Sequence, residues 1–170
     1  MVILYIATTL DGFIADSEGS VNWIPPAPEG EDFGYADFYA SCSHTVQGGA
    51  TYRQVLTFGD WPYPSTQNLV YSRSATPAND TIEVISTDLE GHIRALKAKA
   101  EGHIWCIGGG SINGQLLAAG LIDEVWQFVL PVNLGSGIPL FGNVAIDPKA
   151  VEVLERSPLA GGGTFIKYRP

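Results

Sequence analysis

The sequence is poor in the side chains that bind metals. Its 170 residues include two cysteines, Cys42 and Cys106, and three scattered histidines, His44, His92 and His103. Neither paired cysteines at zinc-ligand spacing nor an HExxH motif occurs, which argues against metal catalysis. So few cysteines also exclude a disulfide framework. We therefore expect two buried thiols and no metal site.

Basic residues are scarce as well. The chain has 9 Lys and Arg against 18 Asp and Glu, a net charge of −9, and its first basic residue is Arg53. Nucleic acids and anionic membrane surfaces need a basic face, so neither is an expected partner. In so acidic a chain, a phosphorylated ligand has to be held by backbone N–H groups and a few bases. Arg53 and Arg73 are the candidates.

Long apolar runs are missing too. No stretch is long enough to span a bilayer, and the apolar run at residues 2–7 has no basic residue before it, unlike a secretory signal. We therefore expect a cytoplasmic protein. With 170 residues and 45% hydrophobic content, residues 1–170 suit one domain with a sizeable core.

What the sequence does have is a run of three glycines, Gly108 to Gly110. They follow an apolar run at 103–107 and open a helical pattern from Ser111 to about Ala119. Glycines let backbone N–H groups approach an anion, and a helix start adds unpaired N–H donors and the positive end of its dipole. We interpret this segment as a nucleotide diphosphate site. On the glycines alone, a tight turn that binds nothing is the equal alternative.

Apolar runs alternate with helical patterns along the whole chain. We expect strands at 2–7, 45–47, 68–74, 82–85, 103–107 and 124–131, helices at 32–43, 48–56, 88–100 and 111–119, and a long loop at 16–31. This alternation predicts an α/β fold, a single three-layer α/β/α domain with a mostly parallel central sheet. The last strands, near 151–154 and 164–168, have no helix between them and predict antiparallel edge strands.

Common catalytic and nucleotide motifs do not fit. A dinucleotide fingerprint counted from Gly108 needs glycine where Asn113 stands, and the Gly-Lys pair of a P-loop is absent. A hydrolase using Ser41 or Cys42 with His44 stays a minor alternative. Adjacent residues on one helix point in different directions, and no third group is evident.

Four stretches together carry a resemblance to a known family. Thr9-Leu-Asp-Gly-Phe-Ile-Ala is similar to an opening S-L-D-G-F-I-A motif, Gly48-Gly-Ala-Thr-Tyr to G-R-x-T-Y, Leu69-Val-Tyr-Ser-Arg to V-L-S-R, and the segments 108–111, 121–125 and 131–141 to a C-terminal pattern. In this order they resemble the dihydrofolate reductase-like family, most closely the branch that holds the reductase domain of bacterial riboflavin biosynthesis. Each motif is weak, but the ordered set spans nearly the whole chain.

The resemblance implies a dihydrofolate reductase-like fold and an NADPH-dependent reductase of a small heterocyclic substrate. The implied activity is similar to 5-amino-6-(5-phosphoribosylamino)uracil reductase, with dihydrofolate reductase proper less favoured. Ala7 and Thr8 would present backbone groups to the nicotinamide amide, and Ile14 would pack on that ring. Ser72 and Arg73 would meet the adenosine ribose and its 2′-phosphate.

The resemblance also implies two walls around the cofactor's phosphates. One wall would come from Gly48, Ala50 and Thr51, and the facing wall from Gly109, Gly110, Ser111 and Ile112. The substrate of the riboflavin branch carries a phosphate of its own, and Arg53 is the nearest base in sequence for it.

One position departs from the pattern. Gly49 stands where the family usually has arginine, which removes a charge-assisted contact with a phosphate. NADH is then an alternative cofactor to NADPH. A non-catalytic nucleotide-binding or assembly protein that kept the fold is the alternative function.

The resemblance places an acid near the start of the first helix, and both Asp32 and Asp37 lie in that region. Either could protonate the substrate during hydride transfer. Asp32 is equally suited to cap the helix, and Asp37 to a solvated position. Asp11 is expected to fix a loop by accepting backbone N–H groups.

Aromatic side chains and the apolar run at 121–130 leave two questions open. Trp23, Tyr35 and Phe38 could form the wall of a site for a flat ring, although aromatics at helical spacing are more often core. The run at 121–130 suits either a buried central strand or a dimer seam. A homodimer is an expectation from the family resemblance.

Overall fold

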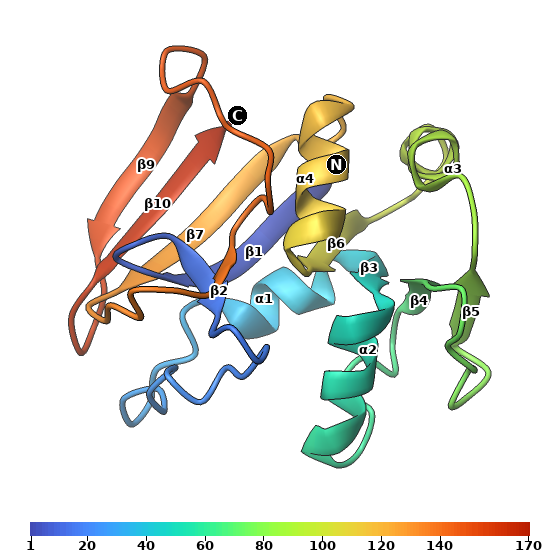
Figure 1. The fold of residues 1–170 in the computed structure, drawn as a ribbon, viewed down its shortest axis with the longest axis horizontal. Helices are drawn as coiled ribbons and strands as arrows, with labels where there is room; N and C mark the ends of the chain where they lie inside the picture. Colours follow the sequence, from blue (N-terminus) through green and yellow to red (C-terminus); the bar gives the residue numbers. More distant parts are fainter.

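The computed structural model describes residues 1–170, and an eight-stranded sheet runs through the molecule in the order β5-β4-β3-β6-β1-β7-β10-β9 (Figure 1). Its strands are β1 (Val2–Thr9), β3 (Cys42–Gly48), β4 (Gln67–Tyr71), β5 (Ile82–Ile85), β6 (His103–Gly108), β7 (Glu124–Leu130), β9 (Glu152–Pro158) and β10 (Thr164–Arg169). Two short strands, β2 (Phe13–Ala15) and β8 (Ile138–Pro139), pair with each other outside this sheet.

The first six strands in the sheet order are parallel, and the last two are joined to the sheet by antiparallel pairing. Neighbouring strands from β5 to β7 all pair parallel, whereas β10 pairs antiparallel with both β7 and β9. The turn between β9 and β10 contains three glycines, Gly161 to Gly163, all with positive φ. Such backbone conformations suit glycine, so the hairpin closes without a helix. The predicted mostly parallel sheet with antiparallel C-terminal edge strands is confirmed.

Four helices cover the sheet on both faces: α1 (Tyr35–Ala40), α2 (Gly49–Val55), α3 (Leu89–Lys97) and α4 (Gly110–Ala118). A short 3₁₀ turn, η1 (Leu56–Phe58), continues α2.

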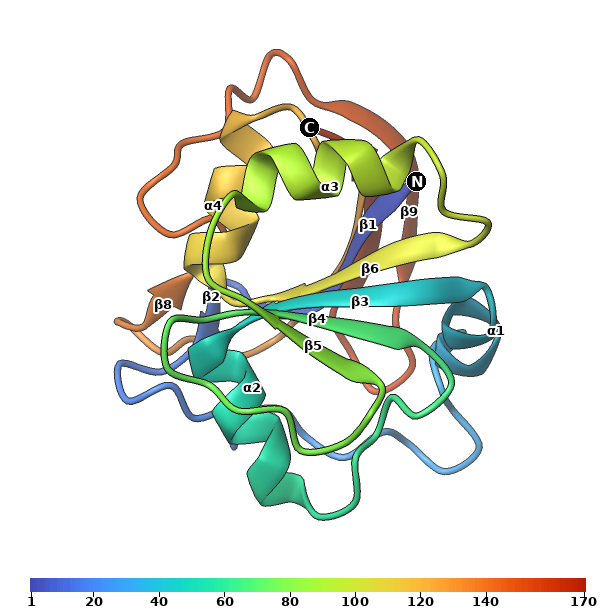
Figure 2. The same ribbon diagram turned by 90° about the vertical axis from the view of Figure 1, so that its right-hand side faces the viewer.

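The helices lie in two layers. Ile93 of α3 and Leu116 of α4 belong to a core cluster with Val46 of β3 on one face. On the other face, Phe38 of α1 packs with Trp105, and α2 contributes to a third cluster. Figure 2 shows α3 and α4 on one side of the strands and α2 on the other. The predicted three-layer arrangement is confirmed.

The helix predicted at 32–43 is shorter than expected. Phe33 and Gly34 have φ values of 55° and 77°, so the helical backbone begins only at Tyr35. The chain enters β3 already at Cys42, which places His44 on a strand rather than near a helix end. In α3, the start is as expected, because the side chain of Asp88 accepts the Gly91 N–H as an N-terminal cap.

The other boundaries move by a few residues. The strand predicted at 68–74 ends at Tyr71, which leaves Ser72 and Arg73 in the loop that follows. β1 extends beyond residue 7 to Thr9. The strand at 82–85 is where it was predicted. As expected, both cysteines are buried free thiols.

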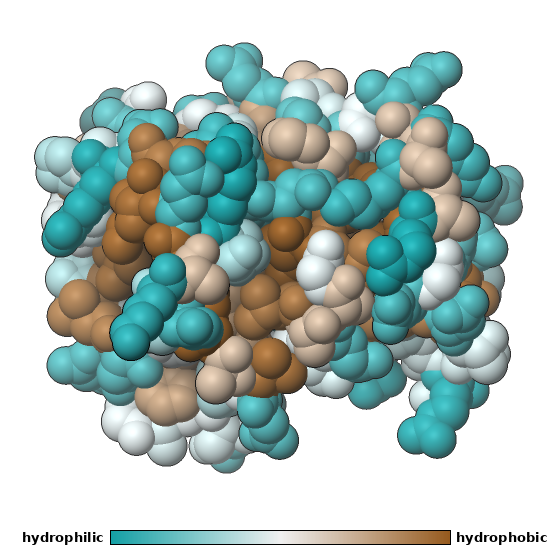
Figure 3. Space-filling model, turned by 90° about the horizontal axis from the view of Figure 1, so that it is seen from above, coloured by the Kyte–Doolittle hydropathy of each residue, from teal (hydrophilic) through white to brown (hydrophobic).

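The run at 121–130 contains a central strand. β7 pairs with β1 on one side and β10 on the other, so its backbone edges are both used within the chain. β9 is the edge strand, and its Val153 and Leu154 are exposed. In the view from above, apolar groups reach the surface on the β9–β10 side, at the left (Figure 3). The homodimer stays a prediction.

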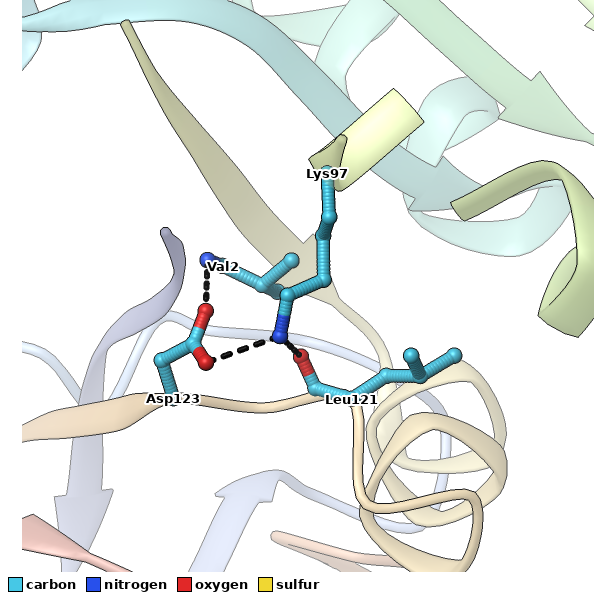
Figure 4. A network of polar contacts seen from close by, with 4 residues as sticks. All are labelled: Val2, Lys97, Leu121 and Asp123. Atoms are coloured by element: carbon cyan, nitrogen blue, oxygen red, sulfur yellow. Dashed lines mark hydrogen bonds and ion pairs between the residues drawn. The ribbon is translucent and has the colours of Figure 1, made fainter. Parts of the chain in front are cut away.

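A polar network ties the amino ends of the strands together (Figure 4). Lys97 Nζ, at the end of α3, donates to the carbonyl oxygen of Leu121 at 3.1 Å and to Asp123 Oδ1 at 2.8 Å. The second carboxylate oxygen of Asp123 accepts the Val2 N–H at 2.6 Å. One half-buried ion pair thus joins α3, β1 and the approach to β7. None of the helices is long and apolar enough to span a membrane.

Candidate active site

A cleft of about 1270 Å³ opens at the carboxyl ends of the parallel strands. Residues at or just after the ends of β1, β3, β4, β5 and β6 line it, together with the starts of α2 and α4 and part of the loop at 16–24. Parallel strands end at one common edge, and ligands of open α/β sheets bind there. Several separate chain segments therefore meet around one space.

Two residues of the triple glycine, Gly109 and Gly110, line this cleft, and the local packing leaves little room for larger residues at all three positions. Gly108 has a φ of +106°, a conformation that favours glycine, and its peptide bond to Gly109 is cis. A Cβ on Gly110 would lie 2.5 Å from the backbone oxygen of Pro139, and one on Gly109 would lie 3.3 Å from Thr51 Oγ1. The glycines thus let the start of α4 pack closely against the β8 segment and face α2.

Asn113, which breaks the dinucleotide fingerprint, has a structural role behind these glycines. It is fully buried, its Nδ2 donates to the carbonyl oxygen of Leu140 at 2.8 Å, and its Oδ1 accepts the thiol of Cys106 at 3.3 Å. It therefore fixes α4 to β6 and to the segment after β8. This explains why the glycine of a Rossmann turn is not needed at this position.

All but one of the predicted cofactor residues line the cleft: Ala7, Ile14, Gly48, Ala50, Thr51, Ser72, Arg73, Gly109, Gly110, Ser111 and Ile112. The exception is Thr8, which is fully buried and accepts Gln127 Nε2 with its Oγ1 at 2.8 Å. Its side chain faces the sheet interior rather than the cleft. That the lining residues bind a cofactor stays a prediction.

Sequence reasoning missed the aromatic wall of the cleft, which consists of Tyr5, Tyr63 and Trp105. The rings of Tyr5 and Tyr63 meet that of Trp105 edge to face, at centroid distances of 6.2 and 5.2 Å. Burial raises the pKa of both tyrosines, so both phenols stay protonated at neutral pH. The available signal was Tyr5, which lies two residues before Ala7 and therefore on the same face of β1.

The aromatic residues proposed from sequence are elsewhere. Trp23, Tyr35 and Phe38 do not line the cleft. Phe38 is buried and stacks on Tyr5 at 4.5 Å, so it supports the wall from behind. The alternative interpretation, that aromatics at helical spacing belong to the core, holds for Phe38.

Neither Asp32 nor Asp37 lines the cleft. The carboxylate of Asp32 accepts the N–H groups of Ala36 and Gly34, at 3.1 and 2.8 Å, and these bonds lower its pKa. Asp32 therefore caps the turn before α1 and stays ionised at neutral pH. Asp37 is exposed in the first turn of α1. Their catalytic role stays a prediction.

Two other carboxylates do line the cleft, Glu18 and Asp88. Asp88 Oδ1 accepts the Gly91 N–H at 3.0 Å and so is engaged in capping α3. Glu18 is exposed in the loop after β2, and its side chain has no hydrogen bond or ion pair within the protein. It is the carboxylate in the cleft that is free to meet a ligand.

The residues of the hydrolase alternative do not form a site. The thiol of Cys42 donates to the carbonyl oxygen of Phe38 at 3.2 Å, and burial raises its pKa to about 11. His44 Nδ1 is paired with Ser43 Oγ at 2.8 Å, not with Ser41 or Cys42. None of these residues lines the cleft. A thiol that holds its proton so firmly is a poor nucleophile.

Asp11 fixes a loop by accepting backbone N–H groups, as expected. Its carboxylate accepts the backbone N–H groups of Gly135 at 2.7 Å and Leu134 at 3.2 Å. This joins the turn after β1 to the loop after β7. No group of three or more His, Cys, Asp or Glu side chains is placed to hold a metal ion.

A model of the RibD C-terminal domain family matches residues 1–157. The chain belongs to this family. Two curated relatives come from Bacillus subtilis: the uncharacterized protein YwjB is 33% identical over 149 residues, with 86% of each chain covered. The uncharacterized protein YyaP is 29% identical over 155 residues, covering 84% of this chain and 81% of its own.

Solved structures agree with the RibD C-terminal domain assignment. A putative riboflavin biosynthesis protein from Shewanella sp. PV-4 is 31% identical, with a TM-score of 0.86 and 99% of this chain and 97% of its own covered. A deaminase/5-amino-6-(5-phosphoribosylamino)uracil reductase from Thermotoga maritima has a TM-score of 0.70 at 19% identity, and this chain covers 56% of it.

The wider fold is that of dihydrofolate reductase. The enzyme from Enterococcus faecalis, described as complexed with NADP(H), has a TM-score of 0.72 at 19% identity, with 99% of this chain and 95% of its own covered. This likeness shows the fold alone. The expected dihydrofolate reductase-like fold is therefore confirmed for this RibD C-terminal domain.

Proposed function

We propose that the protein is an NADPH-dependent reductase of a small heterocyclic substrate, similar in activity to 5-amino-6-(5-phosphoribosylamino)uracil reductase. One observation carries the proposal. A single cleft at the strand ends joins a glycine-lined backbone surface to a wall of aromatic rings. The first surface suits the phosphates of a dinucleotide, and the second suits a flat ring.

The glycine-lined side of the cleft fits a nicotinamide cofactor. Gly109 and Thr51 lie close together in the cleft. A Cβ on Gly109 would lie 3.3 Å from Thr51 Oγ1, so a larger side chain there would press against Thr51. Backbone N–H groups there, and those at the start of α4, would hold phosphate from two sides. Ala7 and Ile14 would position the nicotinamide, and Ser72 and Arg73 the adenosine ribose. The cofactor that we propose is NADPH rather than NADH.

The aromatic side of the cleft would bind the substrate. A bound nicotinamide supplies the hydride, so the protein's task is to hold a planar ring against it and exclude water. Trp105 Nε1 donates to the carbonyl oxygen of Tyr5 at 3.2 Å, which fixes the indole. The protonated phenol of Tyr63 offers a hydrogen-bond donor to a ring carbonyl or nitrogen of the substrate.

Reduction of a carbon–nitrogen or carbon–oxygen double bond also needs a proton. The resemblance points to Asp32 or Asp37, and we keep both as candidates. The cleft adds Glu18 as a third candidate, because its carboxylate is in the lining and unengaged. A group that donates must approach the reacting atom to within hydrogen-bond distance, which favours Glu18.

Calorimetric titration of the purified protein with NADPH and with NADH is the direct test, run in parallel on wild type and Arg73→Ala. We expect NADPH to bind and to lose about tenfold or more in affinity in the variant, because one charge-assisted contact contributes about 1.5–3 kcal/mol. A second assay follows NADPH oxidation at 340 nm with the phosphoribosylaminouracil substrate and, separately, with dihydrofolate.

The assays separate the proposal from its alternative. Binding of NADPH without its oxidation by any pyrimidine or pteridine would support a non-catalytic nucleotide-binding protein that kept the fold. Binding of neither dinucleotide would overturn the cofactor proposal itself. Faster NADPH oxidation with dihydrofolate than with the aminouracil would overturn the proposed substrate in favour of dihydrofolate.

A further inference from the structure

Two arginines without carboxylate partners lie at one corner of the cleft. Arg73 is in its lining, and Arg53 lies beside it, because Arg53 Nη1 is 3.4 Å from the position of a Cβ on the lining residue Gly49. Arg53 on α2 and Arg73 after β4 are both exposed, and neither takes part in an ion pair. The chain as a whole has a net charge of −9, so most of its surface repels anions. The free guanidinium groups at this corner attract anions, so this corner differs from the rest of the surface.

Gly49 lies between Ser72 and Arg53. A Cβ on Gly49 would lie 2.5 Å from Ser72 Oγ and 2.8 Å from Ser72 Cβ, so residue 49 has no room for a side chain unless Ser72 moves. The same Cβ would lie 3.4 Å from Nη1 of Arg53. The guanidinium of Arg53, one helical turn after Gly49, therefore lies in contact distance of the point where a side chain of residue 49 would begin.

Ser72 completes the corner with a fixed hydroxyl. Its Oγ accepts the N–H groups of Ser74 at 3.2 Å and of Ala75 at 3.1 Å. These two bonds orient the oxygen, while its proton is donated to no atom of the protein. Ser72 and Arg73 both line the cleft, so a hydroxyl donor and guanidinium donors face the same end of it.

We propose that Arg53 supplies the cation that binds the cofactor's 2′-phosphate, in place of the arginine absent at position 49 and together with Ser72 and Arg73. A phosphate monoester is a dianion that two guanidinium groups and a hydroxyl match in charge and in donors. This rests on the proposed function and sharpens it. Gly49 then does not weaken the preference for NADPH, and Arg53 serves the cofactor rather than the substrate's phosphate.

The experiment measures dissociation constants of NADPH and NADH by calorimetry for wild type, Arg53→Ala, Arg53→Lys and Arg156→Ala. Arg156, on β9, is likewise exposed and without an ion pair, so it controls for the loss of one positive charge. We expect Arg53→Ala to weaken NADPH binding at least tenfold, which is about 1.4 kcal/mol, and to leave NADH within twofold. Arg53→Lys should recover part of the loss, and Arg156→Ala should match wild type.

Adenosine 2′,5′-bisphosphate and AMP serve as fragment probes on the same variants. Only the first carries the 2′-phosphate, so its affinity should fall in Arg53→Ala and that of AMP should not. A raised salt concentration should reduce the wild-type preference for the bisphosphate, because the contact is between partly exposed charges. The side chain of Arg53 is exposed and makes no ion pair within the protein, so the variant is expected to fold, and its melting temperature checks this.

The outcomes separate this inference from the function on which it rests. If wild type binds neither dinucleotide, the proposed function fails and the inference with it. If wild type binds NADPH tighter than NADH and Arg53→Ala keeps that ratio, the inference alone is overturned. Equal wild-type affinity for both dinucleotides overturns the inference as well and leaves a reductase without 2′-phosphate recognition.

Discussion

Polar groups are paired within the protein at one end of the parallel strands and left unpaired at the other. At the amino ends, charges are paired: Lys97 meets Asp123, and Glu124, almost fully buried, accepts Trp126 Nε1 at 2.8 Å and lies 3.1 Å from Lys167 Nζ. At the carboxyl ends, the cleft collects backbone donors beside glycines, and Arg73 in its lining has no ion-pair partner.

This difference separates stability from binding. A polar group that is paired inside the protein contributes to the folded state and has nothing left to offer a ligand. A group that stays unpaired beside a cleft contributes little to folding but remains free to bind. Substitutions at the amino ends should therefore change the melting temperature, and substitutions at the carboxyl ends should change affinity or rate.

The largest effect is expected from removing the proton donor. Glu18→Gln should lower kcat about hundredfold, since general acid catalysis contributes about 10²–10⁴-fold, while NADPH affinity stays unchanged. Asp32→Asn should act on stability instead, because Asp32 holds the turn before α1 through two N–H groups. Steady-state kinetics of Glu18→Gln, Asp32→Asn and Asp37→Asn make the comparison. A hundredfold loss in either aspartate variant, with Glu18→Gln active, would restore the acid that the resemblance implies.

Gly110→Ala should lower both stability and NADPH affinity, because residue 110 is tightly packed and also lines the cleft. The new Cβ would come within 2.5 Å of a backbone oxygen at Pro139, which cannot rotate away. Overpacking of this kind costs about 1–3 kcal/mol, and the shifted start of α4 should weaken NADPH binding as well. Chemical denaturation and calorimetry measure the two effects. Ser111→Ala, one residue on and exposed, is the control and should leave stability nearly unchanged.

Asp123→Ala should lower stability without touching the cleft. It leaves Lys97 Nζ with one partner and the Val2 N–H with none, both partly buried, which should cost about 1–2 kcal/mol. The variant's denaturation midpoint should fall while its NADPH affinity matches wild type. If NADPH affinity falls while the variant is fully folded, the two ends of the sheet are coupled.

The smallest effect concerns pH. Burial alone would raise the pKa of Glu124, but hydrogen bonds from Trp126 and Lys167 and the charge of Lys167 outweigh it and lower the pKa. The stability that this carboxylate adds is thus present above its unfolded pKa of about 4.3 and is lost as the pH falls through its lower folded value. Melting temperatures of wild type and Glu124→Gln between pH 7 and pH 3 should converge toward the acid end. Curves that stay parallel would contradict this.

Much of the framework was predictable from local patterns. The strand at 82–85 and the cap of α3 at Asp88 depend on neighbouring residues only. The order of motifs along the chain likewise predicted which loops meet at the strand ends. Most of the predicted lining followed from that single rule.

The features that the sequence did not predict depend on contacts or backbone conformations that no local pattern marks. Tyr63 lies in a proline-flanked turn, and its contact with Trp105 spans 42 residues, so nothing local marks it as part of the wall. The late start of the first helix, at Tyr35, depends on positive φ at Phe33 as well as Gly34, which is uncommon for a residue with a Cβ. Asp32 looked equally suited to catalysis and capping from the sequence, and the folded turn shows that it accepts the N–H groups of Gly34 and Ala36.

The sequence by itself determined the alternation of strands and helices, the glycines at the strand ends, and the acidic charge that makes each arginine notable. These are properties of short segments, fixed by side-chain periodicity and by backbone freedom. Only the tertiary structure decided which groups face the cleft: Tyr5 and Trp105 on its wall, and Glu18 in its lining. Such neighbours are brought together by sheet pairing and helix packing, and those contacts join residues too far apart in the chain for any local pattern to record.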